Sequence, residues 1–401
     1  MDVVVIGAGI VGTSAALTLA ERGVGVVVAE RGSVAGEASG LNAGLISAGG
    51  WGDQPTIDVV LEMGSRDRYL DLSENRGHDI GLDTTGTLTL IRTEEERDWA
   101  EASVAAARRV GRSFELLTSD ELVDLEPSAD PALLGAILDP LAARAEPVAA
   151  TQAFAAEAAS AGAVIKIRCP VTALRPRGDG GWDVEIAQDD QIDVLRADAV
   201  ILAAGPWCAE LGAMVGVEVP IVAVRGQMWA SAPQPLVLRH AIAATESSLT
   251  WALQGPSNTS PPNLTHRLGQ RVTRHLYGRQ RPNGQFVFGG DRVLTTDRTI
   301  DHDGIAVNHG HTAELLPLVQ KLPPARTWAG LMPFSVDGRP LLGPIPGREG
   351  LFLAGGLASA GFGRGPMTGQ LIADLVLGRE PEYDLASLAP IGRVVDADQA
   401  R

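Results

Sequence analysis

The chain has 401 residues, of which 45% are hydrophobic and 20% charged, a balance typical of a folded globular protein rather than a disordered one. Its formal net charge of -16 disfavours anionic partners, so we expect neither nucleic acid nor an anionic membrane surface as a partner. The two cysteines, Cys169 and Cys208, have no metal-ligand spacing and no apolar run reaches membrane-spanning length, so a cytoplasmic protein without a metal site is expected.

The first residues predict a strand and a helix joined by a turn that binds a dinucleotide. Residues 3–6 are a continuous apolar run of strand length, and Gly7, Gly9 and Gly12 follow it in the pattern Gly-x-Gly-x-x-Gly. In such a unit the first glycine permits the tight turn, the second lets the backbone approach a pyrophosphate, and the third lets helix and strand pack closely.

A helix over residues 13–22 and a second strand over residues 24–29 complete a βαβ unit. The positive N-terminus of the helix would face the phosphates. Glu30 ends the second strand, where a carboxylate accepts hydrogen bonds from a ribose 2′-hydroxyl and repels a 2′-phosphate. The sequence therefore favours FAD or NAD over NADP. The alternative is a glycine-rich turn that binds no nucleotide.

A long segment of small residues, 31–52, follows the βαβ unit. Small residues permit close backbone approach to a flat or extended ligand. A flexible linker is the alternative, which we disfavour because it would leave four large apolar side chains in solvent: Leu41, Leu45, Ile46 and Trp51. The chain then predicts helices over residues 58–75, 94–110 and 147–161, a short helix that begins with the capping residues 118–121, and strands over residues 87–91, 135–138, 164–167, 182–186 and 199–205.

The second half predicts a different kind of sheet. Antiparallel strands are expected over residues 221–228, 274–279 and 285–288, and residues 254–263, rich in Pro, Ser and Asn, predict an exposed loop or lid. Helices are expected over residues 312–320 and 366–377. Because Pro366 would lie in the first turn of the last helix, after the glycine-rich residues 361–365, this corner is a second candidate for binding an anion.

Together these motifs resemble the D-amino acid oxidase superfamily of FAD-dependent oxidoreductases, of the glycine oxidase and sarcosine oxidase type. The resemblance covers most of the chain. It rests on Gly7, Gly9, Gly12 and Glu30, on Val171, and on the motifs at residues 39–44, 203–207, 225–227, 277–279, 288–290, 337–340, 355–357 and 365–369.

The resemblance implies an α/β FAD-binding Rossmann-like domain of the glutathione-reductase type and a second substrate domain of mostly antiparallel β-sheet with helices. The FAD-binding domain would be discontinuous, with residues 1–82, 143–219 and 326–401. The substrate-binding domain would comprise residues 83–142 and 220–325.

The implied cofactor is FAD, with its adenine end at the first βαβ unit and its isoalloxazine ring between residues 39–48 and 356–363. Relatives attach flavin through a C-terminal cysteine or a histidine near the position of Asn42; this chain has neither, so we expect non-covalent FAD. The expected FAD contacts are Gly7, Gly9, Ile10, Val11, Gly12, Glu30, Arg31, Ser39, Asn42, Ala43, Gly44, Leu45, Val171, Ala204, Gly205, Trp207, Gly356, Leu357, Ala358, Ser359, Ala360, Gly361, Phe362 and Gly363.

The implied activity is oxidation of the C–N bond of a small amine or amino acid by hydride transfer to flavin N5, giving an imine that hydrolyses, with O2 or another electron acceptor. Such chemistry needs orientation and desolvation more than a strong base, so no catalytic acid or base is assigned. One alternative is a 2-hydroxy acid dehydrogenase of the same superfamily, which would need a base. Another is a flavin-bearing subunit of a hetero-oligomeric amine dehydrogenase.

One departure from the family concerns the substrate carboxylate. Relatives place the arginine that binds it at the position of Met332 here, and a further substrate-contacting arginine at the position of Ser359. Either another residue binds the carboxylate or the substrate lacks one. For the first case we expect Arg364 to replace the missing guanidinium, with Arg279 and Arg292 as the fallback. The candidate substrate-side residues are Arg364, Tyr277, Arg279, Arg292, Ser359, Trp51 and Met332.

Overall fold

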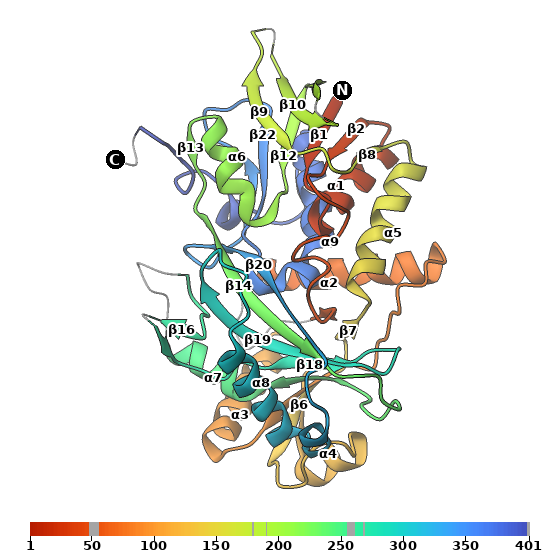
Figure 1. The fold of residues 1–401 in the computed structure, drawn as a ribbon, viewed down its shortest axis with the longest axis vertical. Helices are drawn as coiled ribbons and strands as arrows, with labels where there is room; N and C mark the ends of the chain where they lie inside the picture. The colour runs from red at the N-terminus through yellow and green to blue at the C-terminus, as the bar shows by residue number, and fades with distance from the viewer. Residues whose placement is uncertain (48–55, 179, 190, 255–260, 268, 399–401) are drawn as a thin grey trace.

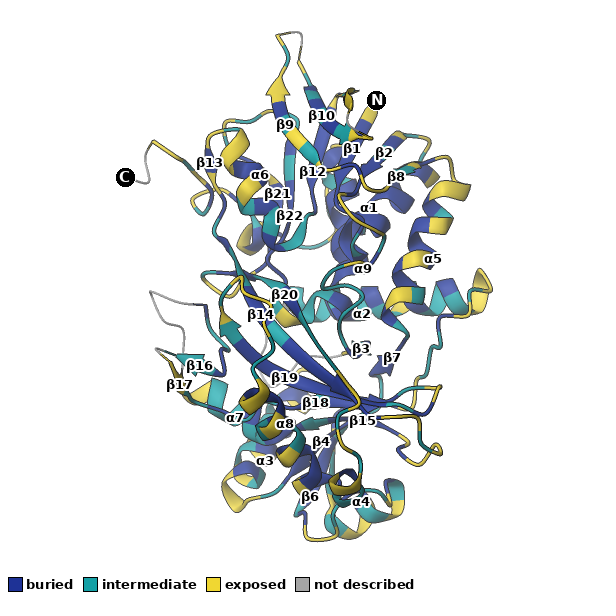
Figure 2. Ribbon diagram, in the orientation of Figure 1, coloured by how far each residue is buried: buried dark blue, intermediate teal, exposed yellow. Residues whose placement is uncertain are grey.

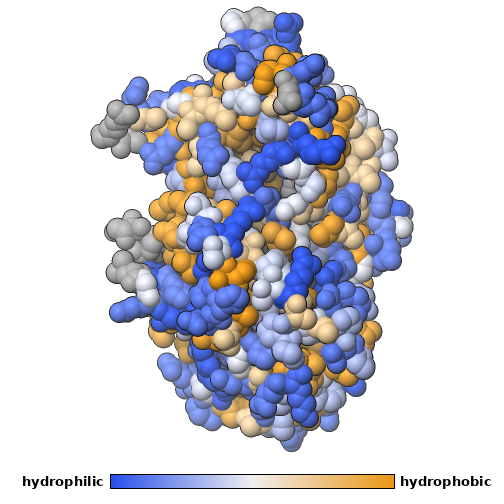
Figure 3. All heavy atoms as spheres, viewed as in Figure 1, coloured by the Kyte–Doolittle hydropathy of each residue, from blue (hydrophilic) through white to orange (hydrophobic). Residues whose placement is uncertain are grey.

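The computed structural model describes residues 1–47, 56–178, 180–189, 191–254, 261–267 and 269–398. Two β-sheets organise the chain, one near the N-terminus and the other at the opposite end of the long axis (Figure 1). Within the described ranges, no helix combines the length and the hydropathy that crossing a membrane requires. The face seen in Figure 3 carries its hydrophobic residues in scattered patches among hydrophilic ones, as folded proteins commonly do.

The smaller sheet has six strands in the order β21-β22-β12-β1-β2-β8. All neighbours are parallel except β21 and β22. The strands are β1 (Asp2–Ile6), β2 (Gly25–Ala29), β8 (Val164–Lys166), β12 (Ala199–Leu202), β21 (Leu341–Pro344) and β22 (Leu351–Gly355).

Both faces of this sheet are covered, which explains why β1 is a continuous apolar run. Val3 and Val5 face the core beneath α1 (Ile10–Glu21), α5 (Pro147–Ser160) and α9 (Gly361–Val376). Val4 and Ile6 face a second core beneath a three-stranded antiparallel sheet of β9 (Val171–Pro176), β10 (Trp182–Gln188) and β11 (Gln191–Ala197). Figure 2 shows the buried strands and helices in dark blue.

The larger sheet has eight strands in the order β20-β14-β19-β18-β15-β4-β6-β5. Its pairs are antiparallel except β15 with β4. The strands are β4 (Thr87–Ile91), β5 (Glu115–Thr118), β6 (Gly135–Asp139), β14 (Ile221–Ala230), β15 (Ala241–Ala244), β18 (Tyr277–Gln280), β19 (Phe286–Leu294) and β20 (Arg326–Ser335).

The remaining elements pack around these sheets. The helices that pack on the larger sheet are α3 (Glu94–Arg109), α4 (Ser119–Leu125), α7 (Thr245–Gln254) and α8 (His302–Leu315). Helix α2 (Thr56–Leu70) packs on α9 and continues as a π-helical turn (Asp71–Asn75). Helix α6 (Cys208–Met214) follows β12. The short strands are β3 (Leu45–Ile46), β7 (Ala143–Arg144), β13 (Val217–Glu218), β16 (His266–Arg267), β17 (Gln270–Arg271) and β23 (Val395–Asp396), and 3-10 turns span Gly205–Trp207, Pro317–Lys321, Ala358–Ala360 and Ala386–Leu388.

The predicted fold class is confirmed: a mostly parallel sheet with helices is combined with a mostly antiparallel sheet. One predicted boundary disagrees with the sheets, because β20 pairs with β14 from Arg326 to Ser335. A division at residue 326 would separate β20 from the sheet to which it is hydrogen-bonded. We therefore propose that the last segment of the cofactor domain begins after Ser335.

Two helix predictions need correction, and one helix was missed. Helix α9 begins at Gly361, so Pro366 lies inside it rather than in its first turn. Helix α8 covers His302–Leu315 instead of residues 312–320, and α7 was not predicted at all. Most of the predicted lid over residues 254–263 lies outside the described residues.

Candidate cofactor and substrate site

A cavity of about 620 Å³ joins the two sheets. Its wall includes the carboxyl ends of β1 and β2 at one end and residues of β4, β15, β18, β19 and β20 at the other. Open α/β sheets bind ligands outside the carboxyl ends of their parallel strands. The cavity therefore reaches from a typical nucleotide position to the face of the larger sheet.

The turn between β1 and α1 has the close packing that the glycine pattern predicts. Gly7 has φ +107°, and a Cβ on it would lie 2.6 Å from the carbonyl oxygen of Ala203. A Cβ on Gly12 would lie 2.0 Å from the carbonyl oxygen of Gly7. The N-terminus of α1 consequently lies at the cavity wall, where its unpaired N–H groups and helix dipole favour a phosphate.

Glu30 is held rigidly at the same end of the cavity. Its carboxylate is buried and accepts hydrogen bonds from the backbone N–H groups of Ala8, at 2.8 Å, and Gly32, at 2.7 Å. Nearby, the guanidinium of Arg31 lies 3.5 Å from the ring centroid of Trp207. A fixed carboxylate beside a helix N-terminus suits the ribose and pyrophosphate of FAD.

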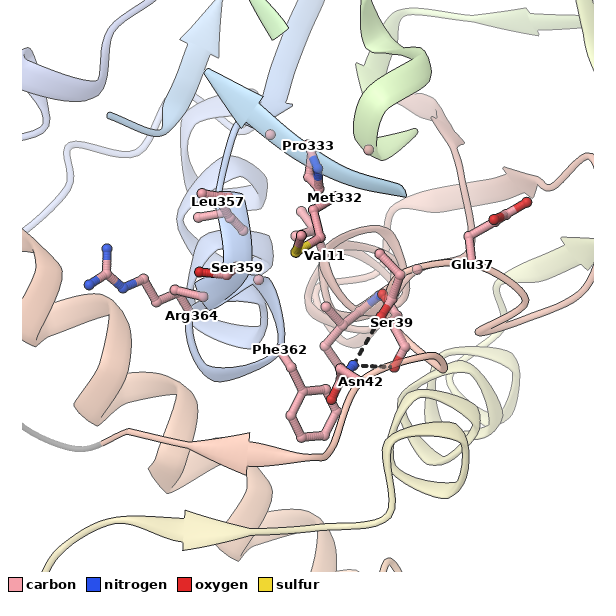
Figure 4. A pocket seen from close by; sticks show the side chains of 18 of the residues that line it. Val11, Glu37, Ser39, Asn42, Met332, Pro333, Leu357, Ser359, Phe362 and Arg364 are labelled. Carbon is pink, nitrogen blue, oxygen red and sulfur yellow. Dashed lines mark hydrogen bonds between the residues drawn. The ribbon is translucent and has the colours of Figure 1, made fainter. Parts of the chain in front are cut away.

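Asn42 fixes the predicted flavin loop (Figure 4). Its Nδ2 donates to the carbonyl oxygens of Ala38 at 3.0 Å and Ser39 at 3.1 Å, and its Oδ1 accepts from the N–H of Gly44 at 2.7 Å. The side-chain oxygen of Ser39 in turn accepts from the N–H of Ile10 at 2.9 Å, which ties the loop to the start of α1.

A second helix N-terminus lies on the cavity wall. Residues 357–363, the turn that leads into α9 and its first residues, line the cavity, and α9 packs along α1 with a hydrogen bond of 2.8 Å from the hydroxyl of Ser14 to the carbonyl oxygen of Pro366. Leu357, Ser359 and Phe362 are seen in Figure 4. The helix N-terminus that the sequence offered as a second anion-binding corner thus lies on the cavity wall, but the helix begins at Gly361, and anion binding there stays a prediction.

Most predicted cofactor contacts lie on the wall of the cavity. Gly12, Ala43, Gly44 and Gly356 are not part of it. Gly12 packs against Gly7 behind the turn, and Gly44 packs against the carbonyl of Ala145. The residues of the wall fit FAD, and Gly12 and Gly44 pack behind them.

Two predicted substrate residues lie elsewhere or outside the described structure. Arg279 is buried away from the cavity, where its guanidinium donates to the carbonyl oxygens of Ala43 and Ala145 and pairs with Glu146 at 2.7 Å. It therefore supports the flavin loop instead of touching substrate. Trp51 lies outside the described residues.

Arg364 lies at the cavity, but its charge is already neutralised. Its guanidinium pairs with Asp58 at 2.9 Å and Glu62 at 2.7 Å, two carboxylates one turn apart on α2. Burial raises the pKa of Asp58, and the charge of Arg364 opposes that shift. In Figure 4 the side chain of Arg364 extends away from Met332. The prediction that Arg364 binds the substrate carboxylate is not supported by this arrangement.

Arg292 has the opposite surroundings. It is buried on β19, donates to Nε2 of His275 at 2.7 Å, and lies 4.5 Å from the ring centroid of Trp251. Among the residues described, no carboxylate pairs with it, and burial lowers its pKa to about 10. Tyr277 and Met332 lie on the same cavity wall.

The sequence reasoning missed His275 and Trp251. His275 stands two residues before Tyr277, and both rings reach the cavity and lie 5.6 Å apart, centroid to centroid. That alternation was the one available signal for His275. Trp251 belongs to α7, a helix that the sequence did not predict.

Known proteins resemble the whole chain. A model of the DAO family, described as FAD dependent oxidoreductase, matches residues 2–375. Glycine oxidase of Geobacillus kaustophilus (strain HTA426) is 30% identical over 393 residues, covering 96% of this chain and 95% of that protein. A crystal structure of glycine oxidase from Geobacillus kaustophilus superposes with a TM-score of 0.82 at 28% sequence identity, covering 97% of each chain. Mitochondrial dimethylglycine dehydrogenase of Mus musculus is 26% identical over 402 residues, covering 97% of this chain and 44% of that protein. This chain therefore belongs to the FAD dependent oxidoreductase family, and its cofactor is FAD.

Proposed function

We propose that this protein oxidises the C–N bond of a small amino acid, such as glycine or an N-methylated glycine, to an imine that water then hydrolyses. Relatives that align with nearly all of this chain include a glycine oxidase, a dimethylglycine dehydrogenase and a D-amino acid dehydrogenase. When bound, FAD accepts a hydride from the substrate carbon next to nitrogen. The observation that carries the proposal is the continuous cavity from Glu30 to the guanidinium of Arg292, which has no carboxylate partner among the described residues.

The protein's own part in the reaction is binding and desolvation. Aromatic and apolar residues, among them Tyr277, Trp251 and Met332, line the substrate end and exclude water from the reacting carbon. The buried positive charge of Arg292 disfavours a second cation nearby, so it favours the neutral amine over the ammonium ion. The neutral amine is the form that gives up a hydride.

Oxidation of a 2-hydroxy acid is less well supported. That reaction needs a base for the hydroxyl proton. Among the described residues of the cavity wall, His275 is the one histidine, and its Nε2 already accepts from Arg292. Burial also holds the pKa of His275 well below its usual value.

An anaerobic screen tests the function. The holoprotein is mixed with glycine, sarcosine, D-alanine, glycolate and D-lactate, and bleaching of the flavin absorbance is followed. We expect amino acids to bleach the flavin and hydroxy acids to leave it oxidised. Bleaching by the hydroxy acids alone would overturn the proposal in favour of the dehydrogenase alternative.

The electron acceptor and the attachment of FAD form part of the same proposal. The reduced protein is mixed with O2 or with an artificial dye, and turnover of the isolated chain with either one argues against a role solely as a flavin-bearing subunit.

Acid precipitation should release intact FAD, because no cysteine follows Cys208. A coloured pellet would show a covalent link.

The predicted cytoplasmic location is supported by Cys169 and Cys208, which are free thiols.

A further inference from the structure

Three polar atoms at the substrate end of the cavity have no hydrogen-bond partner among the residues that the structure describes. They are Nη1 of Arg292, Nδ1 of His275 and Nε1 of Trp251, and all three are buried. Each residue lines the cavity. Buried polar groups without partners are uncommon, and each costs about 1–3 kcal/mol. Three such nitrogen atoms in one place indicate a binding site for a ligand with hydrogen-bond acceptors.

The three side chains form one cluster. The ring centroids of Trp251 and His275 are 4.3 Å apart, and the guanidinium carbon of Arg292 lies 4.5 Å from the centroid of Trp251. Nη2 of Arg292 lies 2.7 Å from Nε2 of His275. The residues come from α7, from the segment before β18 and from β19.

Every unpaired atom in this cluster is a donor. A guanidinium only donates, so Nε2 of His275 must accept from it, and the imidazole proton resides on Nδ1. The low pKa of His275 agrees with this neutral tautomer. The indole N–H of Trp251 also only donates. The cluster thus presents donors and a positive charge, and its one acceptor, Nε2 of His275, is already bonded to Arg292.

We propose that Arg292, His275 and Trp251 together bind the carboxylate of the substrate. This inference rests on the proposed function, because it assigns an amino acid rather than a simple amine as the substrate class. A carboxylate has two oxygens with about four acceptor positions, enough for three N–H donors. Charge-assisted hydrogen bonds of this kind are also about twice as strong as neutral ones.

The register of the larger sheet explains how Arg292 can do what an arginine at the position of Met332 does in relatives. Gly226 on β14 pairs with Arg292 on β19, and Val224, two residues earlier on the same strand, pairs with Met332 on β20. Paired residues, and residues two apart on one strand, point to the same face of a sheet. Arg292 and Met332 therefore flank Gly226 on the face toward the cavity. The guanidinium of Arg292 thus comes from β19, two strands away from β20, where the family resemblance would place it.

The main test measures the kinetics of the holoenzyme after Arg292→Met. We expect KM for the best amino acid to rise at least tenfold, about 1.4 kcal/mol, while KM for the corresponding amide, which lacks the negative charge, stays within about threefold. Trp251→Phe keeps the ring beneath Arg292 but removes the N–H, and it should raise KM by about three- to tenfold. The matched control is Arg175→Met, which removes a guanidinium whose side chain is 65% exposed on β9.

A relocation variant tests the geometry directly. Arg292→Met combined with Met332→Arg returns the guanidinium to β20 on the same face, and we expect it to recover at least part of the lost affinity for the amino acid. Arg292→Lys keeps the charge but not the planar fork, so KM should fall between wild type and Arg292→Met. An unchanged KM in Arg292→Lys would overturn the proposal even if Arg292→Met does not fold.

Stability separates a binding site from a structural contact. Burying a cation that has no carboxylate partner among the described residues costs free energy, and this cost offsets the hydrogen bond to His275, so Arg292→Met should leave the free energy of unfolding of the substrate-free holoenzyme unchanged or raise it. A loss of stability with an unchanged KM would show a structural role and overturn the inference.

Failure of this inference and failure of the proposed function give different results. If amino acids bleach the wild-type flavin but Arg292→Met leaves their KM unchanged, only the inference falls. If no amino acid bleaches the flavin, titration with benzoate and benzamide, read from the flavin spectrum, still tests the site. Benzoate should then bind to the wild type and at least tenfold more weakly to Arg292→Met, and equal binding of benzoate and benzamide would overturn it.

Discussion

Arg279 and Arg292 lie on neighbouring strands with buried guanidinium groups, but within the described part of the chain only Arg279 has a carboxylate partner. Arg279 joins β18 to the flavin loop and to the start of α5 through Ala43, Ala145 and Glu146. Arg292 faces the cavity with a donor to spare. Residue type alone does not distinguish Arg279 from Arg292 as a candidate substrate ligand. Their difference arises because successive strands of the sheet place them against different neighbours.

The first prediction concerns Arg279→Met, which leaves Glu146 with one partner fewer in a largely buried position. We expect a loss of about 3 kcal/mol in the free energy of unfolding, because the carbonyl oxygens of Ala43 and Ala145 lose a buried charged donor and Glu146 keeps only Arg281 as its partner. Urea unfolding of the holoenzyme measures it. Arg281→Met is the control: its side chain is 34% exposed and shares Glu146, so it should cost less than about 1 kcal/mol. Equal losses in both variants would contradict the structural role of Arg279.

The second prediction concerns Glu30→Ala. Removal of the carboxylate should weaken FAD binding by about 1–3 kcal/mol, since charge-assisted hydrogen bonds to the ribose are lost. Flavin fluorescence during titration of the apoprotein gives the dissociation constant. Glu101→Ala, on the exposed side of α3, serves as the control. A dissociation constant equal to that of wild type would count against Glu30 as the ribose ligand.

Helix α9 shows how an element tolerates a residue that normally breaks it. Pro366 has no N–H to donate to the carbonyl oxygen of Phe362, four residues earlier. The hydroxyl of Tyr69, from α2, donates to that oxygen at 2.8 Å instead. The helix consequently continues back to Gly361 and brings its N-terminus to the cavity. A contact from a distant part of the chain decides where α9 begins, which no local pattern reveals.

The third prediction tests this explanation with a double-mutant cycle. Tyr69→Phe leaves the buried carbonyl of Phe362 without a donor and should cost about 1–3 kcal/mol of unfolding free energy. In a Pro366→Ala background the new N–H can satisfy that carbonyl, so the same change should cost clearly less. Urea unfolding of the four proteins gives the coupling energy. The explanation fails if Tyr69→Phe costs the same in both backgrounds.

Other elements differ in how far the sequence predicts them. The apolar runs of β1 and β12 identify buried strands because both faces of their sheet are covered. Helix α8 has Gly304 in its first turn and Gly310 in its interior, and such glycines lower the intrinsic helix propensity. Its position depends on Asn308, which accepts from the indole N–H of Trp229 at 2.9 Å and donates to the carbonyl of His275 at 3.0 Å. These tertiary hydrogen bonds explain why the sequence predicted this helix at residues 312–320 and not at His302–Leu315.

At the scale of the molecule, the two halves of the cavity were unequally predictable. The cofactor half is built from contiguous glycine motifs that carry their own turn and helix signals, so most of its wall was identified. The substrate half is assembled from α7, β18, β19 and β20, and it depends on the register of the eight-stranded sheet. Sequence alone supplied Arg292 and Tyr277 as candidates. It could not show that Arg364 is paired with Asp58 and Glu62.

The whole molecule should also lose stability in acid, and one histidine contributes a defined part of that loss. His311, on α8, is buried beside Glu246, with Nε2 3.4 Å from a carboxylate oxygen. Arg92, Arg274 and Glu314 surround the same group. Burial is the main cause that lowers the pKa of His311 to about 4, from its usual 6.5.

The sign of the effect follows from proton uptake. Between pH 6.5 and 4 the unfolded chain holds a proton on this histidine that the folded chain lacks, so acid favours the unfolded state. The stabilisation is fully present above the unfolded pKa and is lost as the pH falls toward the folded one. From pH 7 to pH 5, His311 should account for a loss of about 2 kcal/mol.

The fourth prediction compares wild type with His311→Gln in urea unfolding at pH 7 and pH 5. The other buried titrating groups, such as His275 and Asp58, contribute equally to both proteins, so their effects cancel in the difference. Wild type should lose about 2 kcal/mol more than His311→Gln over this interval. Equal losses would mean that His311 takes up its proton in the folded protein, through its ion pair with Glu246. In that case the network of Arg92, Arg274, Glu246 and Glu314 would tolerate a third positive charge.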